Sequence, residues 1–307
     1  MTLSQTVLQL DAAAEPSRLR LLVALLSGET SVGDLVAVLE QSQPRVSRHL
    51  RLLAEAGLVE SFREGRSIYY RWSAPGLEAG IVSSVAALAA GSDATLARDR
   101  ERQHKLSRQR ERDALRRALR AGRARGLQGA DTDTALADLL RTTLAPTRGP
   151  RPLGDILQVG CGSGELLRLL LPAARSAVGT ESSGHRRQVA RARLRLAGLP
   201  HWTIRDAMPT KLPWTGADFD LVILQDVLGT GAEVQNILHE AARVLRPTGH
   251  LLILERILPT DGELSARLSA LGFAVNRRQW LPGRTPDQAL FLASRPEAHL
   301  ARTGTND

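Results

Sequence analysis

The sequence predicts an α/β chain of two domains: an N-terminal helical domain ending in a β-hairpin, and a C-terminal doubly wound sheet with a closing antiparallel strand. Two observations predict this organisation. Residues 15–57 hold three short helical patterns, and two alternating strand patterns follow at residues 58–72. From Gly154 onward, buried-strand patterns alternate with amphipathic helices, which is typical of a parallel sheet. The 307 residues suffice for two hydrophobic cores.

The N-terminal helices are predicted from apolar spacing and from residues that start or stop helices. A helix over residues 15–28 begins with a proline and ends on a glycine suited to a left-handed stop. A second helix covers residues 31–39, with its apolar residues on one face. The third begins after Ser42, whose hydroxyl can cap it, and ends at Gly57.

The third helix has the side chains of a DNA-recognition helix. Val46, Leu50 and Leu53 share its apolar face, so its polar residues point outward. Glutamine and arginine suit base edges, and serine and arginine suit phosphates. The residues predicted to contact DNA are Gln43, Arg45, Ser47, Arg48, His49 and Arg51. His49 lies near the apolar face, so packing and DNA contact are both open for it.

Residues 58–62 and 67–72 alternate apolar and polar positions across an arginine-bearing turn, which predicts a β-hairpin. Arg63 and Arg66 at its tip are placed to reach the DNA backbone or the minor groove. Two helices, a recognition helix and this hairpin together make a winged helix-turn-helix, in which the hairpin is the wing.

Residues 18–72 resemble the ArsR/SmtB family of bacterial repressors, through QPRVSRHLRLLAEAGLV from Gln43 and REGRSIYYR from Arg63. The resemblance implies a homodimer, paired through the first helix and an apolar helix at residues 77–90, that reads a two-fold symmetric double-stranded DNA operator. Metal-sensing members carry ELCVCDL where this chain has ETSVGDL. Ser31 and Gly33 replace the two thiolates, and residues 77–90 contain no His or Cys, so no metal site is expected.

The excess positive charge lies between the two domains. Residues 76–130 hold twelve Lys and Arg against six Asp and Glu, most of them in a helical pattern over residues 94–124. Two interpretations remain open: association with nucleic acid by counterion release, and a solvated helix rich in arginine. If the C-terminal domain signals to the DNA-binding domain, this linker helix is the natural lever.

A glycine turn joins the first strand and first helix of the C-terminal domain. Glycines at positions 160, 162 and 164 permit a tight turn and close approach of a ligand to a helix N-terminus. A dinucleotide-binding fingerprint would place the third glycine one residue later. Glu181 ends the second strand, where a carboxylate can accept both ribose hydroxyls, and Asp206 follows the third strand. Singly, each carboxylate is equally typical of a helix cap at a strand end.

The glycine turn and the two carboxylates are followed by the strand FDLVIL at residues 219–224 and by a helix, turn and strand at residues 241–254. Through these features, residues 153–295 resemble class I S-adenosylmethionine-dependent methyltransferases. The resemblance implies that the glycine loop lies against the methionine moiety, that Glu181 holds the ribose, and that Asp206 contacts the adenine amino group. The residues expected to bind S-adenosylmethionine or S-adenosylhomocysteine are Gln158, Gly160, Cys161, Gly162, Gly164, Glu181, Asp206, Ala207 and Gln225. Cys161 is expected only to fill a small slot in the turn.

Two departures from the methyltransferase pattern leave catalysis open. Gln158 stands where many members have Asp or Glu, which should weaken attraction for a cationic sulfonium relative to the neutral product. After the fourth strand, residues 225–232 offer no aromatic wall and no obvious general base beyond Asp226. No catalytic residue is therefore assigned.

We expect a DNA-binding domain at residues 1–92, a basic helical linker at 93–152, a methyltransferase-like domain at 153–296 and a disordered tail at 297–307. The expected function is a transcriptional regulator whose C-terminal domain binds S-adenosylmethionine or S-adenosylhomocysteine. The alternative is an active methyltransferase that modifies a small-molecule acceptor and carries an autoregulatory DNA-binding head; a vestigial domain is a third reading. A lone cysteine and the lack of a signal peptide or a long apolar run favour the cytoplasm.

Overall fold

The computed structural model describes residues 2–73, 86, 93–120, 153–229, 233–255, 261–281 and 288–295. The chain divides into two compact units. The first unit comprises residues 1–154 and 161–208, and the second comprises residues 155–160 and 209–307. The expected helix at 77–90, apart from the helical and buried Ala86, lies outside the described residues, as do residues 121–152 of the expected linker and the tail.

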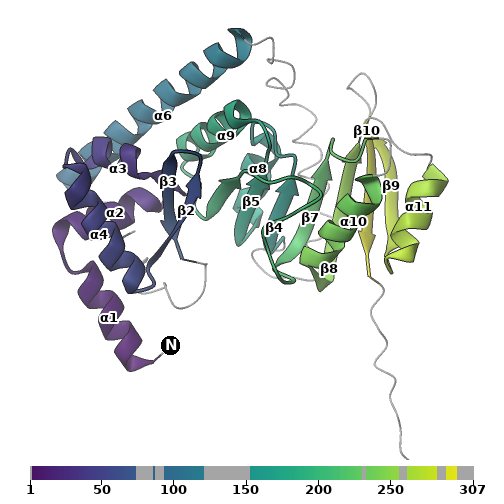
Figure 1. The fold of residues 1–307 in the computed structure, drawn as a ribbon, viewed down its shortest axis with the longest axis horizontal. Coiled ribbons are helices and arrows are strands. Elements are labelled where there is room, and N and C mark those ends of the chain that lie inside the picture. The colour runs from purple at the N-terminus through teal and green to yellow at the C-terminus, as the bar shows by residue number, and fades with distance from the viewer. Residues whose placement is uncertain are drawn as a thin grey trace, which may run out of the picture. The chain divides into compact units, whose positions relative to one another are not determined.

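The first unit begins with the winged helix-turn-helix that the sequence predicts (Figure 1). Its elements are α1 (Leu3–Ala13), α2 (Pro16–Leu25), β1 (Thr30–Ser31), α3 (Val32–Leu39), α4 (Gln43–Glu55), β2 (Val59–Glu64) and β3 (Ser67–Trp72). The strands form a sheet in the order β1-β3-β2. Helix α1 and the two-residue strand β1 were not predicted, because α1 buries little of its apolar surface and β1 is too short to show alternation.

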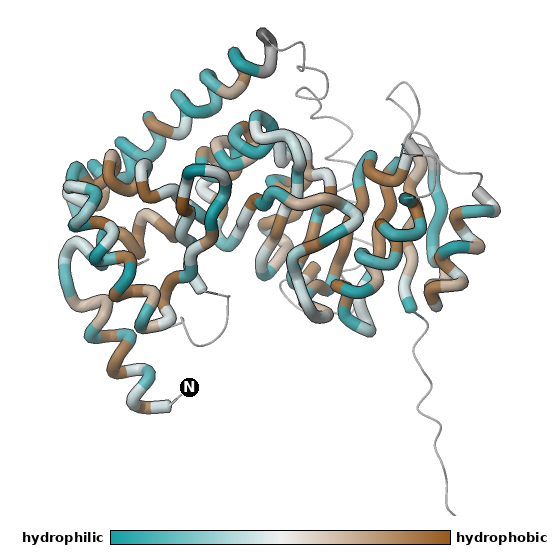
Figure 2. The backbone as a smooth tube through the Cα atoms, in the orientation of Figure 1, coloured by the Kyte–Doolittle hydropathy of each residue, from teal (hydrophilic) through white to brown (hydrophobic). Residues whose placement is uncertain are grey.

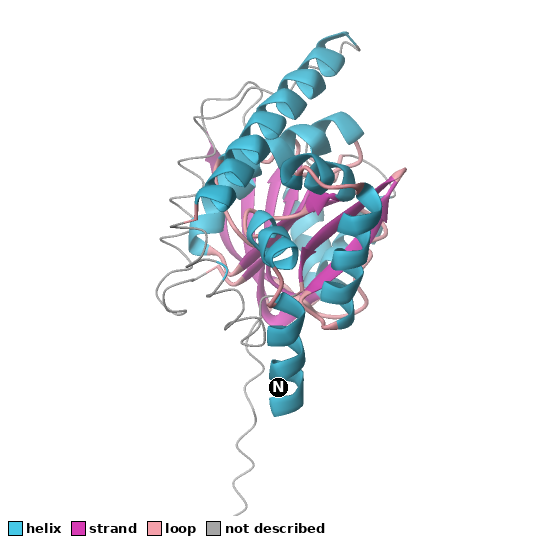
Figure 3. Cartoon of the chain, turned by 90° about the vertical axis from the view of Figure 1, so that its left-hand side faces the viewer, coloured by secondary structure: helices cyan, strands magenta, loops and turns pink. Residues whose placement is uncertain are grey.

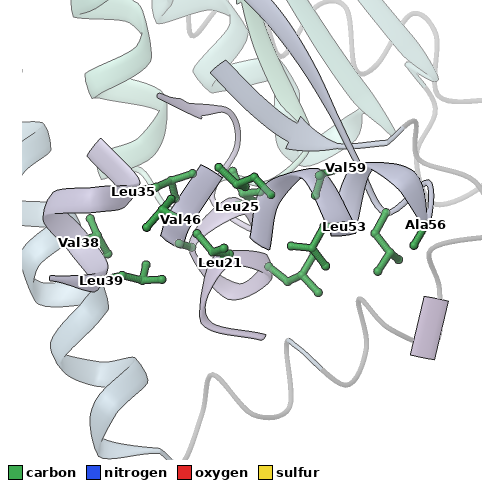
Figure 4. Close-up of a cluster of buried hydrophobic side chains, with 13 residues drawn as sticks. Leu21, Leu25, Leu35, Val38, Leu39, Val46, Leu53, Ala56 and Val59 are labelled. Carbon is green, nitrogen blue, oxygen red and sulfur yellow. The ribbon is translucent and has the colours of Figure 1, made fainter. Parts of the chain in front are cut away.

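The core of this domain lies between α2, α3, α4 and the hairpin (Figure 4). Val46, Leu50 and Leu53 of α4 are fully buried, which confirms the predicted apolar face. They pack in one cluster with leucines and valines of α2 and α3, such as Leu21 and Val38. Burying each such side chain stabilises the fold by about 1.5–3 kcal/mol. This core holds the outward face of α4 in place.

Helix α6 (Ala94–Arg120) lies in the same unit, and Figure 3 shows it as one straight helix. It packs on α2, α3 and α9 (Gly184–Leu196). Its buried positions follow one helical face: Leu96, Asp99, Gln103, Ser107 and Ala114. Asp99 pairs with Arg20 at 2.7 Å, and Arg110 pairs with Asp34 at 2.7 Å. The described part of the expected linker is therefore a packed helix with one buried and one exposed face. Most of its residues are hydrophilic (Figure 2).

A seven-stranded sheet has the order β6-β5-β4-β7-β8-β10-β9. Its strands are β4 (Asp155–Val159), β5 (Ser176–Thr180), β6 (Trp202–Arg205), β7 (Phe219–Gln225), β8 (Leu245–Glu255), β9 (Ala274–Leu281) and β10 (Gln288–Ser294). Strand β5 pairs with β6, and β7 with β4 and β8, in parallel; β10 is antiparallel to β8 and β9. The predicted sheet and its closing antiparallel strand are confirmed.

The described helices of this domain are α8 (Glu165–Leu170), a 3-10 turn (Leu171–Ala173), α9, α10 (Glu233–Val244) and α11 (Asp261–Ala270). The central strands read as continuous apolar runs, and Leu221 to Leu224 of β7 are all buried (Figure 2). Strand β8 starts at Leu245, directly after the last residue of α10. Within the described ranges, no helix is both long and apolar enough to cross a membrane.

Candidate functional site

The outward face of α4 carries the polar residues predicted for DNA contact. Gln43, Arg45, Arg48 and Arg51 are exposed, and Ser47 is half-buried. His49 is also half-buried, and its Nδ1 lies 3.7 Å from Oε2 of Glu15, the residue that caps α2. This placement favours the packing role for His49. The other five side chains form one accessible polar surface.

The two faces of the wing lie in different surroundings, one in solvent and one against the protein. Arg63 and Arg66 are exposed at the tip, around Gly65, whose φ of +56° forms the turn. Glu64 precedes the turn, and its side chain is only 15 % exposed. Successive side chains of a strand point to opposite faces, so Arg63 faces solvent when Glu64 faces the protein.

The three glycines of the loop after β4 have positive φ values of +78°, +55° and +80° at Gly160, Gly162 and Gly164. A Cβ at Gly160 would lie 2.4 Å from the carbonyl oxygen of Gln225, and one at Gly164 would lie 3.1 Å from the Cβ of Ala190. A Cβ at Gly162 would meet no described atom within 4 Å. Packing within the fold therefore accounts for two of the glycines, whereas Gly162 borders open space.

Glu181 follows β5 and is joined to the glycine loop. Its Oε2 accepts a hydrogen bond from the backbone N–H of Gly162 at 3.1 Å, and its Oε1 accepts one from Ser183 at 2.8 Å. The residue is 7 % exposed. Two backbone donors fix this carboxylate beside the one loop glycine that borders open space.

Cys161 fills a slot in the turn. It is 4 % exposed, and its Sγ would lie 2.7 Å from a Cβ placed at Gly179 of β5. Burial raises the pKa of its thiol far above the ordinary value, so the thiol stays protonated at neutral pH. These surroundings suit a packing residue and not a nucleophile.

Asp206 follows β6 and pairs with an arginine that the sequence analysis missed. Its side chain is 55 % exposed, and its Oδ2 accepts a hydrogen bond from Nη2 of Arg187 at 2.9 Å. Arg187 also donates from Nη1 to the backbone oxygen of Glu181 at 2.6 Å. Next to Asp206, Ala207 is half-buried and Met208 is 59 % exposed. One guanidinium therefore links the ends of β5 and β6.

In the second unit, two glutamine side chains meet at the ends of β4 and β7. Gln158 is fully buried, and its Nε2 donates to Oε1 of Gln225. The Oε1 of Gln158 has no hydrogen-bond partner among the described residues. The loop after β7 is held by Glu255, whose Oε1 accepts from the backbone N–H groups of Val227 and Leu228 at 2.7 Å each. This edge of the sheet therefore carries a neutral amide pair.

Helix α9 has a row of buried arginines: Arg187, Arg191 and Arg195 are each no more than 6 % exposed. Arg191 donates from Nε to Glu29 at 2.6 Å and from Nη2 to Glu64 at 2.6 Å, and its guanidinium lies 4.2 Å from the centre of the Tyr69 ring. The signal in the sequence was the four-residue spacing of these arginines, which places them on one helix face. Arginines on one face suggest a solvated surface unless carboxylates from elsewhere meet them.

Comparison with known proteins assigns both domains. Residues 15–61 match the model of the arsR family of bacterial regulatory proteins, and residues 157–253 match a methyltransferase domain model. The transcriptional activator HlyU of Vibrio cholerae is 38% identical over 76 residues, which are 25% of this chain and 70% of HlyU. The biofilm growth-associated repressor of Agrobacterium fabrum is 43% identical over 68 residues, covering 22% of this chain and 58% of that protein.

The methyltransferase half has a relative as well. A ubiquinone biosynthesis O-methyltransferase of Rhizobium etli is 29% identical over 160 residues, covering 51% of this chain and 62% of that enzyme. The matches to three repressors of this group span 46–58% of the repressors' own lengths. The chain belongs to the arsR family of bacterial regulatory proteins, and it carries a methyltransferase domain after its winged helix-turn-helix.

Proposed function

We propose that the protein is a transcriptional regulator that binds a double-stranded DNA operator as a homodimer and that binds S-adenosylmethionine or S-adenosylhomocysteine in its methyltransferase domain. DNA binding is supported by the exposed residues of α4 and by Arg63 and Arg66 at the wing tip. These side chains have the donors that base edges and phosphates accept.

One observation carries the proposal for the ligand: the Glu181 carboxylate is held by the Gly162 N–H at 3.1 Å, next to open space. A buried carboxylate with free lone pairs can accept both hydroxyls of a ribose. Asp206, half-exposed after the next strand, has the acceptor that an adenine amino group needs. The residues present therefore fit a nucleoside, and Gly162 leaves the room that its approach requires.

The resemblance to methyltransferases supports the neutral product as the preferred ligand, because Gln158 stands where many of them have Asp or Glu. A carboxylate at position 158 would attract the positive sulfonium of S-adenosylmethionine, whereas an amide does so far less. The attraction between unit charges 4 Å apart is about 1 kcal/mol in water and larger in a cleft, and about 1.4 kcal/mol is tenfold in affinity. We therefore expect S-adenosylhomocysteine to bind several-fold more tightly than S-adenosylmethionine.

The homodimer is supported by the apolar surface of α1. Leu3, Val7, Leu8 and Leu10 are 82%, 56%, 51% and 42% exposed in the single chain. A second copy of the chain would remove this surface from water, at about 25 cal/mol for each Å². Light scattering coupled to size exclusion would then report the mass of a dimer, and Leu8→Glu should shift the protein toward monomer.

The ligand proposal is tested by calorimetry with S-adenosylhomocysteine and by operator binding with and without it. The operator is first selected from random duplexes. Gly162→Arg fills the open space next to Glu181 and should abolish ligand binding without loss of operator binding. Gly57→Arg, at another glycine of positive φ with no atom within 4 Å of its Cβ, is the matched control and should keep ligand binding. Undetectable ligand binding by the unmodified chain would refute the ligand half of the proposal.

A further inference from the structure

One side chain, Arg187, contacts both the wing and the candidate nucleoside site. Arg187 is 6 % exposed, and its Nε donates to Oε1 of Glu64 at the end of β2, at 3.0 Å. Its Nη2 donates to Asp206 at 2.9 Å, and its Nη1 donates to the backbone oxygen of Glu181 at 2.6 Å. The same planar group therefore contacts the wing and both residues proposed to hold the nucleoside.

The wing side of this contact is firmly held. Glu64 also receives two hydrogen bonds from Arg191, at 3.0 and 2.6 Å. The Phe62 ring lies 3.5 Å from the guanidinium of Arg205 and stacks on Tyr69 at 5.4 Å between centroids. Phe62 and Glu64 share one face of β2, and they contact arginines of β6 and α9, whereas Arg63 stays exposed on the other face. A shift at Arg187 would thus move the DNA-contacting tip with it.

The ligand side of this contact can change. Asp206 is 55 % exposed, and its carboxylate has more acceptor positions than Arg187 uses. An adenine amino group that binds this carboxylate competes with Arg187 or reorients the carboxylate. Arg187 is buried and must keep partners, because a buried charge without a partner is costly. When the bond between Arg187 and Asp206 weakens, the guanidinium therefore depends more on Glu64 and on its backbone acceptors.

We propose that Arg187 transmits ligand occupancy to the wing: a nucleoside bound at Glu181 and Asp206 shifts Arg187 and, through Glu64, alters how the wing meets DNA. This inference rests on the proposed function and names its regulatory route, which runs through α9 rather than through α6 alone. A ligand changes operator affinity only if it interacts differently with the two states of the wing. The coupling is reciprocal, so the operator must change ligand affinity by the same factor.

The test measures the ratio of operator Kd with and without saturating S-adenosylhomocysteine, by fluorescence anisotropy on the full chain. We expect a ratio of about fivefold or more for the unmodified protein, the usual size of such couplings. Glu64→Gln should bring the ratio to within about twofold of one, with the ligand Kd of the DNA-free protein changed by less than about threefold. Glu60→Gln is the matched control: Glu60 lies on the same strand and pairs with Arg71 at 2.8 Å, so the ratio should not change.

Two additions keep the test decisive if Glu64→Gln does not fold. Glu64→Asp keeps the charge near Arg191 but shortens the side chain, and it should also lose the coupling. In the unmodified chain, the ligand should change hydrogen exchange in the hairpin, residues 59–72. A ratio that persists in both Glu64 variants, or hairpin exchange that the ligand leaves unaltered, would overturn this inference alone. A lack of ligand binding by the unmodified chain would overturn the proposed function along with it.

Discussion

Replacing Arg191 by methionine should cost the protein several kcal/mol of stability, because it breaks a buried ion cluster. Glu29 is fully buried, and its Oε1 accepts from Nε of Arg191 at 2.6 Å, while its Oε2 accepts from the hydroxyl of Thr203. Arg191→Met keeps most of the volume but leaves the Glu29 carboxylate with the hydroxyl as its side-chain partner. Removing one member of a buried pair typically costs about 3–5 kcal/mol.

The assay is urea unfolding followed by circular dichroism. With a slope of about 2–3 kcal/mol per M, a loss of this size lowers the midpoint by more than about 1 M. Arg71→Met is the matched control: the Arg71–Glu60 pair is 26 % and 43 % exposed, and exposed pairs contribute about 0–1 kcal/mol. The double variant Glu29→Gln/Arg191→Met should regain part of the loss, because the unpaired carboxylate is gone. Equal midpoints for Arg191→Met and Arg71→Met would refute the reasoning.

Three further predictions follow from the described contacts. The buried, protonated thiol of Cys161 should react with a maleimide only on unfolding, so fast labelling of the native chain would contradict its placement. Burial raises the pKa of Glu64, but Arg191 and Arg187 outweigh this effect, so the pKa in the folded chain lies below 4.5. The stability that Glu64 contributes is therefore present above pH 4.5 and is lost as the pH falls through the folded pKa. In Glu64→Gln, the urea midpoint should decrease less steeply over this acidic range. Gln158→Glu should shift relative affinity toward S-adenosylmethionine by about tenfold or less, as calorimetry with both ligands would show; an unchanged ratio argues against a role for this position in selectivity.

Most of the secondary structure could be predicted from the sequence because local patterns carry it. The apolar spacing of α4 predicted its buried face, and Val46, Leu50 and Leu53 are fully buried. The apolar run FDLVIL predicted a buried strand at residues 219–224, and β7 covers this run as Phe219–Gln225. Helix α1 was not predicted, because its apolar residues are largely exposed in the single chain and do not show the spacing of a buried helix face.

The candidate site could be predicted only as separate positions. Glycine spacing and a carboxylate after the second strand pointed to Gly162 and Glu181, and the structure brings them within 3.1 Å. The partner of Glu64 could not be predicted, because Arg187 lies 123 residues from Glu64 along the chain. From the sequence alone, an arginine in an amphipathic helix is predicted to face solvent, and only the fold shows that a carboxylate lies opposite it.

By itself, the sequence determined that a winged helix-turn-helix and a methyltransferase-type sheet occupy one chain, since both are encoded in local periodicity and turn residues. The tertiary structure alone decided that α9 meets the wing through buried arginines, with Arg191 joined to Glu29 across 162 residues of sequence. The physical reason is that a buried charge is stable only with a partner, and which partner it finds depends on packing rather than on the neighbouring sequence.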